Sequence, residues 1–147
     1  MPNNHGPLFW KETSPGVIAP AGGRSISSGV DEILKPSTGS LTAQECSGTI
    51  INNYGQTVAN TQTLPAAAEG LNGMVLIGAS GVGDFNLKAG AGDKIYLDGI
   101  ALDDGDKASL AAPAVGNFFT YWAFKTGANA YDWFVSSGFG TLTDGGA

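Results

Sequence analysis

Few residues in this chain have side chains that could act in catalysis or hold a metal ion. The sequence contains one histidine, His5, and one cysteine, Cys46, among its 147 residues. A Ser-His-Asp or Cys-His arrangement would need His5 as its base, and a zinc site needs more histidine or cysteine ligands than the chain has. We therefore predict no catalytic residue, no metal site and no enzymatic activity.

Carboxylates are the other candidates for chemistry. An acidic run consists of Asp98, Asp103, Asp104 and Asp106. Hard cations such as Ca²⁺ bind several carboxylate oxygens, but this spacing matches no EF-hand loop, and a solvated hairpin loop is the simpler interpretation. A pair for glycoside hydrolysis could come from Glu69, Asp84, Asp93 or Asp132, provided that folding brings two of them together.

Two glycine-rich stretches, 78–83 and 90–94, have the composition of phosphate-binding loops. Neither ends in Gly-Lys-Ser or Gly-Lys-Thr, and neither leads into an amphipathic helix whose N-terminus could receive a phosphate. We interpret both as turns and predict no cofactor.

The amino-acid composition indicates the fold class. Glycine occurs 23 times, which is about 16% of the chain against a usual value of about 7%. Charged residues make up 14%, where about 25% is typical. Short strands joined by glycine turns fit this composition better than long solvated helices do.

Charge and hydropathy exclude two classes of partner. The net charge is −6, and lysine and arginine form no cluster, so we predict neither nucleic-acid binding nor attachment to anionic membranes. No apolar run approaches the roughly 20 residues that span a bilayer. The first five residues do not have the pattern of a secretory signal, and a single cysteine suits a reducing compartment, so we expect synthesis in a cytoplasm.

The first 40 residues predict an extended N-terminal arm, because prolines and glycines interrupt any regular helix or interior strand. Spacing at 28–31 resembles a capping box and predicts at most one helical turn there. The arm also has apolar residues that a solvated linker would lack: Leu8, Phe9, Trp10, Val17 and Ile18. We predict that these residues dock onto a neighbouring subunit or a different protein, with folding back onto the same chain as the alternative.

Residues 41–147 predict an all-β domain, a compact sandwich or jelly-roll-like structure of short strands. Apolar or alternating runs separated by turn residues place strands at 48–54, 61–64, 74–78, 85–88, 94–97, 108–110, 118–125, 131–136 and 141–143. Dipeptides such as Asn72-Gly73 and Asp98-Gly99 tolerate the positive φ of tight turns.

Two of these strands are apolar on both faces. Their large residues are Phe118, Tyr121, Trp122, Phe124, Tyr131 and Trp133. A strand with two apolar faces lies either between two layers or where subunits meet, so we predict that these side chains form the core or an oligomer interface. A sugar-stacking platform made by Tyr121, Trp122, Tyr131 and Trp133 is the alternative.

Four stretches together carry a resemblance to a known family. They are 47–56 (SGTIINNYGQ), 64–68 (LPAAA), 93–99 (DKIYLDG) and 126–133 (TGANAYDW). In order and spacing they resemble small bacteriophage virion proteins that serve as capsid-decoration, head-fibre or tail-fibre β-domains. The resemblance extends from about residue 41 to the end and leaves the arm uncovered.

The resemblance implies a non-enzymatic structural protein that trimerises and projects from a virion. We expect a capsid decoration or head-fibre protein, made in the host cytoplasm and attached through its arm to the major capsid protein or another virion protein. The alternative is a tail-fibre or receptor-binding module that recognises a host glycan. The resemblance implies no catalytic residue.

Overall fold

The computed structural model describes residues 10–14, 17–20, 30–80 and 83–147. Every regular element in these residues is a β-strand, which confirms the predicted all-β fold. The chain divides into two units, Met1–Val30 and Asp31–Ala147.

In the first unit, the described residues form a two-stranded antiparallel hairpin, β1 (Trp10–Ser14) and β2 (Val17–Pro20). The prediction for this proline-rich segment excluded a regular helix and an interior strand, and the hairpin contains neither. Each strand of a two-stranded ribbon is an edge strand, and an edge is where a sheet tolerates proline. Pro20 accordingly lies at the end of β2, opposite Trp10.

The second unit contains two sheets, one of seven strands and one of five. In spatial order the larger sheet consists of β10 (Ile100–Ala101), β9 (Ile95–Leu97), β13 (Ala130–Phe139), β12 (Phe118–Gly127), β7 (Asn72–Leu76), β5 (Ser47–Asn52) and β3 (Glu32–Leu34). The smaller sheet consists of β14 (Leu142–Asp144), β11 (Lys107–Leu110), β8 (Phe85–Lys88), β6 (Asn60–Thr63) and β4 (Gly39–Ser40). The nine predicted strands all overlap observed ones, namely β5 to β9 and β11 to β14.

The two sheets pack face to face around one core, which confirms the predicted sandwich. One buried cluster contains Ile51, Val75 and Tyr121 from the seven-stranded sheet and Leu87 from the five-stranded sheet. Across the interior, the rings of Phe85 in β8 and Phe119 in β12 lie 6.1 Å apart. Sheet-on-sheet burial of this kind is the main source of stability in such a domain.

The boundary predicted between arm and domain at residue 40 lies too far along the chain. β3 pairs with β5, and β4 pairs with β6, so residues 32–40 contribute a strand to each sheet. Glu32 to Leu34, where one helical turn was predicted, is strand instead. Pairing with β5 outweighs the weak local preference of three residues for a helix.

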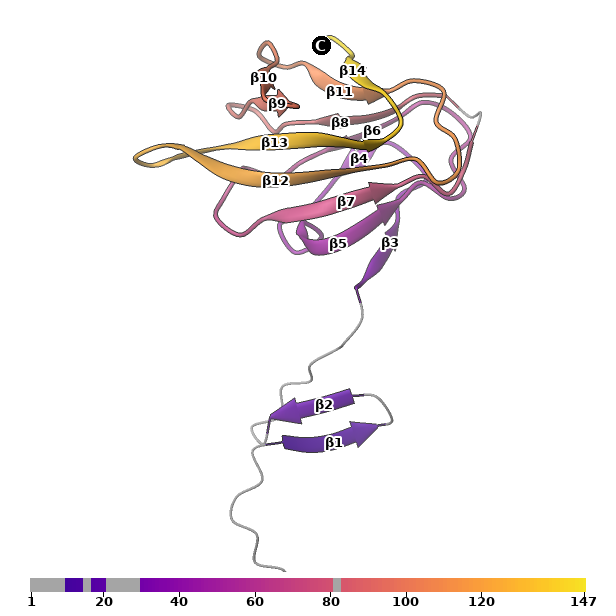
Figure 1. Cartoon of the computed structure of the whole chain (residues 1–147), viewed down its shortest axis with the longest axis vertical. Helices are drawn as coiled ribbons and strands as arrows, with labels where there is room; N and C mark the ends of the chain where they lie inside the picture. The colour runs from indigo at the N-terminus through magenta and orange to yellow at the C-terminus, as the bar shows by residue number, and fades with distance from the viewer. Residues whose placement is uncertain (1–9, 15–16, 21–29, 81–82) are drawn as a thin grey trace, which may run out of the picture. The chain divides into compact units, whose positions relative to one another are not determined.

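The chain between β3 and β8 passes back and forth between the two sheets. Within the larger sheet β3, β5 and β7 are parallel neighbours, and within the smaller sheet β4, β6 and β8 are parallel neighbours. These six strands therefore make three windings of a two-sheet coil. β12 and β13 then form a long antiparallel hairpin that lies between β7 and β9 (Figure 1).

Buried side-chain amides join neighbouring windings. The side-chain oxygen of Asn53, in the second winding, accepts hydrogen bonds from the backbone N–H groups of Gly78 (2.8 Å) and Ala79 (3.0 Å), in the third. The amide nitrogen of Gln62, also in the second, donates to the backbone oxygen of Ser37 in the first, at 2.7 Å. Buried amides need such partners, so they fix how the windings stack.

Candidate functional site: the outer face of the seven-stranded sheet

Strand β12 separates its aromatic residues between two environments. Phe119 and Tyr121 point into the core and are 1% and 0% exposed, whereas Phe118 and Trp122 point outward and are 38% and 39% exposed. Alternate residues of a strand point to opposite faces of the sheet. Of the two predicted alternatives, core or oligomer interface, Tyr121 therefore belongs to the core.

Strand β13 repeats this division. Trp133 is fully buried, and its indole N–H donates to the backbone oxygen of Pro65 at 3.2 Å. Trp133 is thus also a core residue. Tyr131 is half-buried and lies opposite Lys125, next to the turn of the hairpin.

Aromatic rings on the outward side of β9, β12 and β13 contact one another. Trp122 stacks on Phe134, with centroids 4.7 Å apart and an interplanar angle of 21°. Phe124 meets Phe134 edge-on at 6.0 Å and Tyr96 edge-on at 5.2 Å. These are favourable ring geometries, so the outward rings form a defined cluster.

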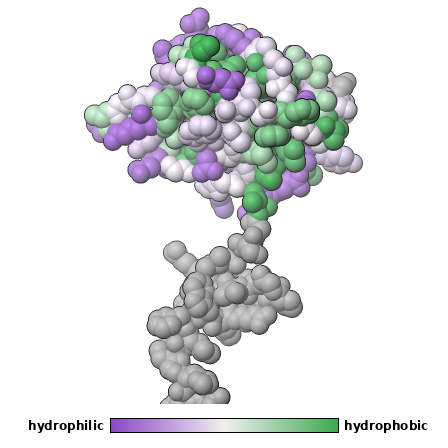
Figure 2. All heavy atoms as spheres, viewed as in Figure 1, coloured by the Kyte–Doolittle hydropathy of each residue, from purple (hydrophilic) through white to green (hydrophobic). Residues whose placement is uncertain are grey.

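Aliphatic residues continue this surface across β7, β5 and β3. Leu76 lies beside Phe118 in the register of β12 and β7, and Met74 lies beside Ile50 in that of β7 and β5. Leu34, on the edge strand β3, is 54% exposed. We call the whole set the outer apolar face: Leu34, Ile50, Met74, Leu76, Tyr96, Phe118, Trp122, Phe124 and Phe134. Figure 2 shows hydrophobic residues gathered on the side of the domain where β3, β5 and β7 lie.

The outer face of the five-stranded sheet has the opposite chemistry. Its outward positions are Thr61, Thr63, Asn86, Lys88, Lys107, Ser109 and Thr143. Lys88 and Lys107 lie directly opposite each other in the register of β8 and β11. Hydroxyl, amide and ammonium groups make this face polar, although Asn86 and Ser109 at its middle are each only 5% exposed.

Sequence reasoning found three members of the outer apolar face, Phe118, Trp122 and Phe124. It missed the other six because their direction depends on which strands pair. For Phe134 a signal was available, since alternation along 131–135 places it opposite Tyr131 and Trp133.

The predicted docking residues belong to the first unit. Trp10 is the first residue of β1, and Val17 and Ile18 begin β2. Leu8 and Phe9 lie outside the described residues, as does His5.

Cys46 lies in the core, where its thiol is unsuited to nucleophilic chemistry. The Tyr121 hydroxyl donates to its Sγ at 3.9 Å. Burial raises the pKa of Cys46 to about 11 and also raises the pKa of Tyr121. A thiol that stays protonated near neutral pH is a poor nucleophile and metal ligand.

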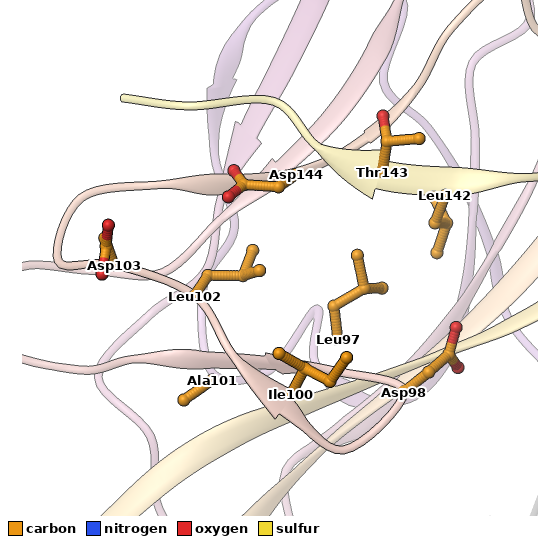
Figure 3. A pocket seen from close by; sticks show the side chains of 9 residues that line it. All are labelled: Leu97, Asp98, Ile100, Ala101, Leu102, Asp103, Leu142, Thr143 and Asp144. Carbon is orange, nitrogen blue, oxygen red and sulfur yellow. The ribbon is translucent and has the colours of Figure 1, made fainter.

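Two residues of the acidic run, Asp98 and Asp103, line an open hollow of about 500 Å³ together with Asp144 (Figure 3). Leu97, Leu102 and Leu142 point toward its centre, with Asp103 and Asp144 at its margin. Partial desolvation and the neighbouring Asp144 raise the pKa of Asp106. In the part of the chain that the structure describes, no three acidic, histidine or cysteine side chains are grouped as ligands for a metal ion.

Carboxylates considered for glycoside hydrolysis have structural partners. Asp93 accepts a hydrogen bond from the backbone N–H of Ala67 at 2.7 Å, and Asp132 accepts one from that of Lys94 at 2.9 Å. Asp98, in the acidic run, accepts from the backbone and the hydroxyl of Ser137. Each of these three carboxylates fixes a loop or strand end.

No protein-family model, curated protein or solved structure matches the chain. Among the described residues, none forms a helix of the length and hydropathy that crossing a bilayer requires.

Proposed function

We propose that this chain is a structural protein of a bacteriophage virion, a capsid decoration or head-fibre protein without enzymatic activity. The observation that carries the proposal is the outer apolar face, which lies on the opposite side of the domain from the polar face of the five-stranded sheet. A surface of this kind is made for binding. The resemblance of 47–56, 64–68, 93–99 and 126–133 to phage virion β-domains supplies the biological setting.

In this proposal the N-terminal unit attaches the protein to the major capsid protein or to another virion protein. Leu8, Phe9 and Trp10 are the anchors, since three consecutive large apolar side chains can bury considerable area at about 25 cal/mol per Å². The β-domain assembles as a homotrimer, so that three arms attach together and each raises the effective concentration of the others.

A glycan-recognition module at the tip of a tail fibre is the second candidate. A sugar ring needs an exposed aromatic face, and burial of Tyr121 and Trp133 removes both from the predicted platform. Trp122 is exposed, although one of its faces is covered by Phe134. Saturable binding of a host glycan that is lost in Trp122→Ala would favour this candidate.

The test is attachment of the full chain to phage capsids that lack it. We expect the double substitution Phe9→Ala and Trp10→Ala to weaken co-sedimentation with capsids by about tenfold or more, because the anchors are lost. Circular dichroism should remain that of the folded β-domain. A Thr61→Ala variant, altered on the polar face, is the matched control and should bind normally. Undiminished binding of the double variant would refute attachment through the arm.

A further inference from the structure

The outward side of the seven-stranded sheet is too apolar for a surface that stays in water. Its nine large apolar residues belong to six different strands. The outward polar residues among them are Glu32, Asn52, Asn72, Thr120, Asp132 and Ser136. Single exposed hydrophobic residues are ordinary, but a contiguous patch marks an interaction site. By contrast, the outward positions of the five-stranded sheet hold threonine, lysine, asparagine and serine.

The size of this side suits a stable protein interface. Each residue of a strand covers about 16 Å² of a sheet, so the seven strands present roughly 600 Å² in projection. Side-chain relief makes the accessible area larger, which brings it close to the roughly 800 Å² per partner of a standard interface. A small ligand would cover only part of such a surface.

Charge on this side favours an identical partner. The outward carboxylates are Glu32, which accepts a hydrogen bond from the Asn52 amide at 2.6 Å, and Asp132, which is bonded to the Lys94 N–H. No lysine or arginine occupies an outward position in the seven strands. A basic partner would find only these two carboxylates, each already hydrogen-bonded, and an acidic partner would find no cation. A second copy of the chain, in contrast, can pack its own apolar residues against those of this side.

The five-stranded sheet could not associate with itself in this way. Lys88 and Lys107 lie side by side on its outward side, so two copies placed face to face would bring four ammonium groups together. Self-association therefore has one suitable sheet face in the described part of the domain.

From these four observations we propose that copies of this chain associate through the outer apolar face, with the stacked pair Trp122 and Phe134 at the centre of the interface. The inference takes from the proposed function only that copies associate, and it adds the surface by which they do so. It deepens that function by assigning attachment to the first unit and self-association to the outer apolar face.

The test begins with the mass of the full chain in solution, measured by sedimentation velocity over a range of concentrations. We expect the unaltered chain to form a trimer and Trp122→Glu to weaken that association by about tenfold or more, because an unpaired carboxylate would be buried. Phe124→Ser should also weaken the association, and it provides a second variant if Trp122→Glu fails to fold. Thr63→Glu, on the polar face, is the matched control and should associate as the unaltered chain does.

A cross-linking experiment places the interface directly. Asn72→Cys introduces a thiol opposite Trp122 on the outward side, and the natural Cys46 is buried. A short bis-maleimide should join copies through position 72 but not through Thr63→Cys.

Three outcomes would overturn the inference: an unaltered chain that is monomeric at all concentrations, association that survives both Trp122→Glu and Phe124→Ser in folded protein, or cross-linking through position 63 instead of 72. Capsid binding is scored separately. A monomeric chain that still binds capsids would refute self-association and support the proposed role in the virion. A chain that associates as expected but binds no capsid would support self-association and refute that role.

Discussion

The two sheets of the β-domain bury their inner faces in one core, but their outer faces differ. The seven-stranded sheet presents phenylalanine, tryptophan, leucine, isoleucine and methionine, and the five-stranded sheet presents threonine, serine, asparagine and lysine. The windings from β3 to β8 supply strands to both sheets in alternation, so position along this part of the chain does not explain the contrast. The proposal that the outer apolar face binds a second copy of the chain would explain this difference.

The contrast between the two outer faces arises from strands that alternate along the chain. A single winding contributes Ile50 to the outer apolar face through β5 and Thr61 to the polar face through β6. Apolar and polar outward residues therefore alternate along the sequence with the windings. An interface assembled in this way is recognised only when the pairing of the strands is known.

The largest expected effect tests the division between inner and outer aromatic residues. Trp133→Ala should lower the free energy of unfolding by about 3–5 kcal/mol, because it opens a cavity in the core and leaves the Pro65 carbonyl without its donor. Trp122→Ala is the matched change, with the same residue type on the outward side. In dilute protein it should cost about 1 kcal/mol, the value of one lost ring contact.

Urea unfolding of both variants, monitored by circular dichroism, measures this pair. If both variants lose the same free energy of unfolding, the division between inner and outer aromatic residues is wrong, because Trp122 would then stabilise the monomer core as much as Trp133 does.

A smaller effect compares packing within the two sheets. Gly73, in β7, lies opposite Tyr121, and a Cβ at this position would overlap the tyrosine hydroxyl. Gly73→Ala should therefore cost about 1–3 kcal/mol. Gly39, in β4, is the control: its nearest neighbours would be 3.9 Å from an added Cβ, so Gly39→Ala should change stability by at most about 0.5 kcal/mol, in the stabilising direction.

Thermal unfolding of the two glycine variants side by side provides the measurement. If Gly73→Ala melts with the unaltered chain, the inner face of the larger sheet is less tightly packed around Tyr121 than the structure indicates.

The smallest effect concerns the connection between the two sheets. Glu45, in the loop from β4 to β5, lies 2.7 Å from the Lys35 ammonium, and bonds to Lys35 and Thr42 hold its pKa below the ordinary 4.5. A carboxyl group whose pKa is lowered by folding stabilises the folded state at pH values above its ordinary pKa. This stabilisation is lost as the pH falls through the folded-state pKa. Acidification from about pH 6 to about pH 3 should therefore destabilise the unaltered chain by roughly 0.5 kcal/mol more than Glu45→Gln.

Urea midpoints at the two pH values test this prediction. An identical acid response in Glu45→Gln would show that the ion pair makes no contribution to joining the sheets.

Local sequence predicted nine of the ten strands from β5 onward, all except β10, because each combines apolar or alternating residues with flanking turn residues. Asp98 has a positive φ of 47° in its Asp-Gly turn, as the dipeptide predicts. The same reasoning failed for β3 and β4, whose two or three residues have little pattern of their own and become strands by pairing with β5 and β6.

The candidate site was only partly predictable. Aromatic residues at 118–124 and 131–133 identified two strands that contribute to the outer apolar face. Their alternation did not indicate which side of each strand faces the second sheet. Parallel pairing brings together residues from separate windings, and nothing local in the sequence records that contact. Ile50 and Met74 were therefore missed, although they are neighbours in the structure.

The position of the β12–β13 hairpin has a consequence for synthesis of the protein on the ribosome. These two strands come late in the chain, yet they lie between β7 and β9 in the middle of the larger sheet. A nascent chain that has emerged only as far as β9 has no neighbour for that strand on its inner side, and β7 keeps an open apolar edge. Because pairing between distant segments is slow, the sheet is completed only when residues 118–139 have emerged. Truncation before this hairpin would leave an incomplete, aggregation-prone sheet.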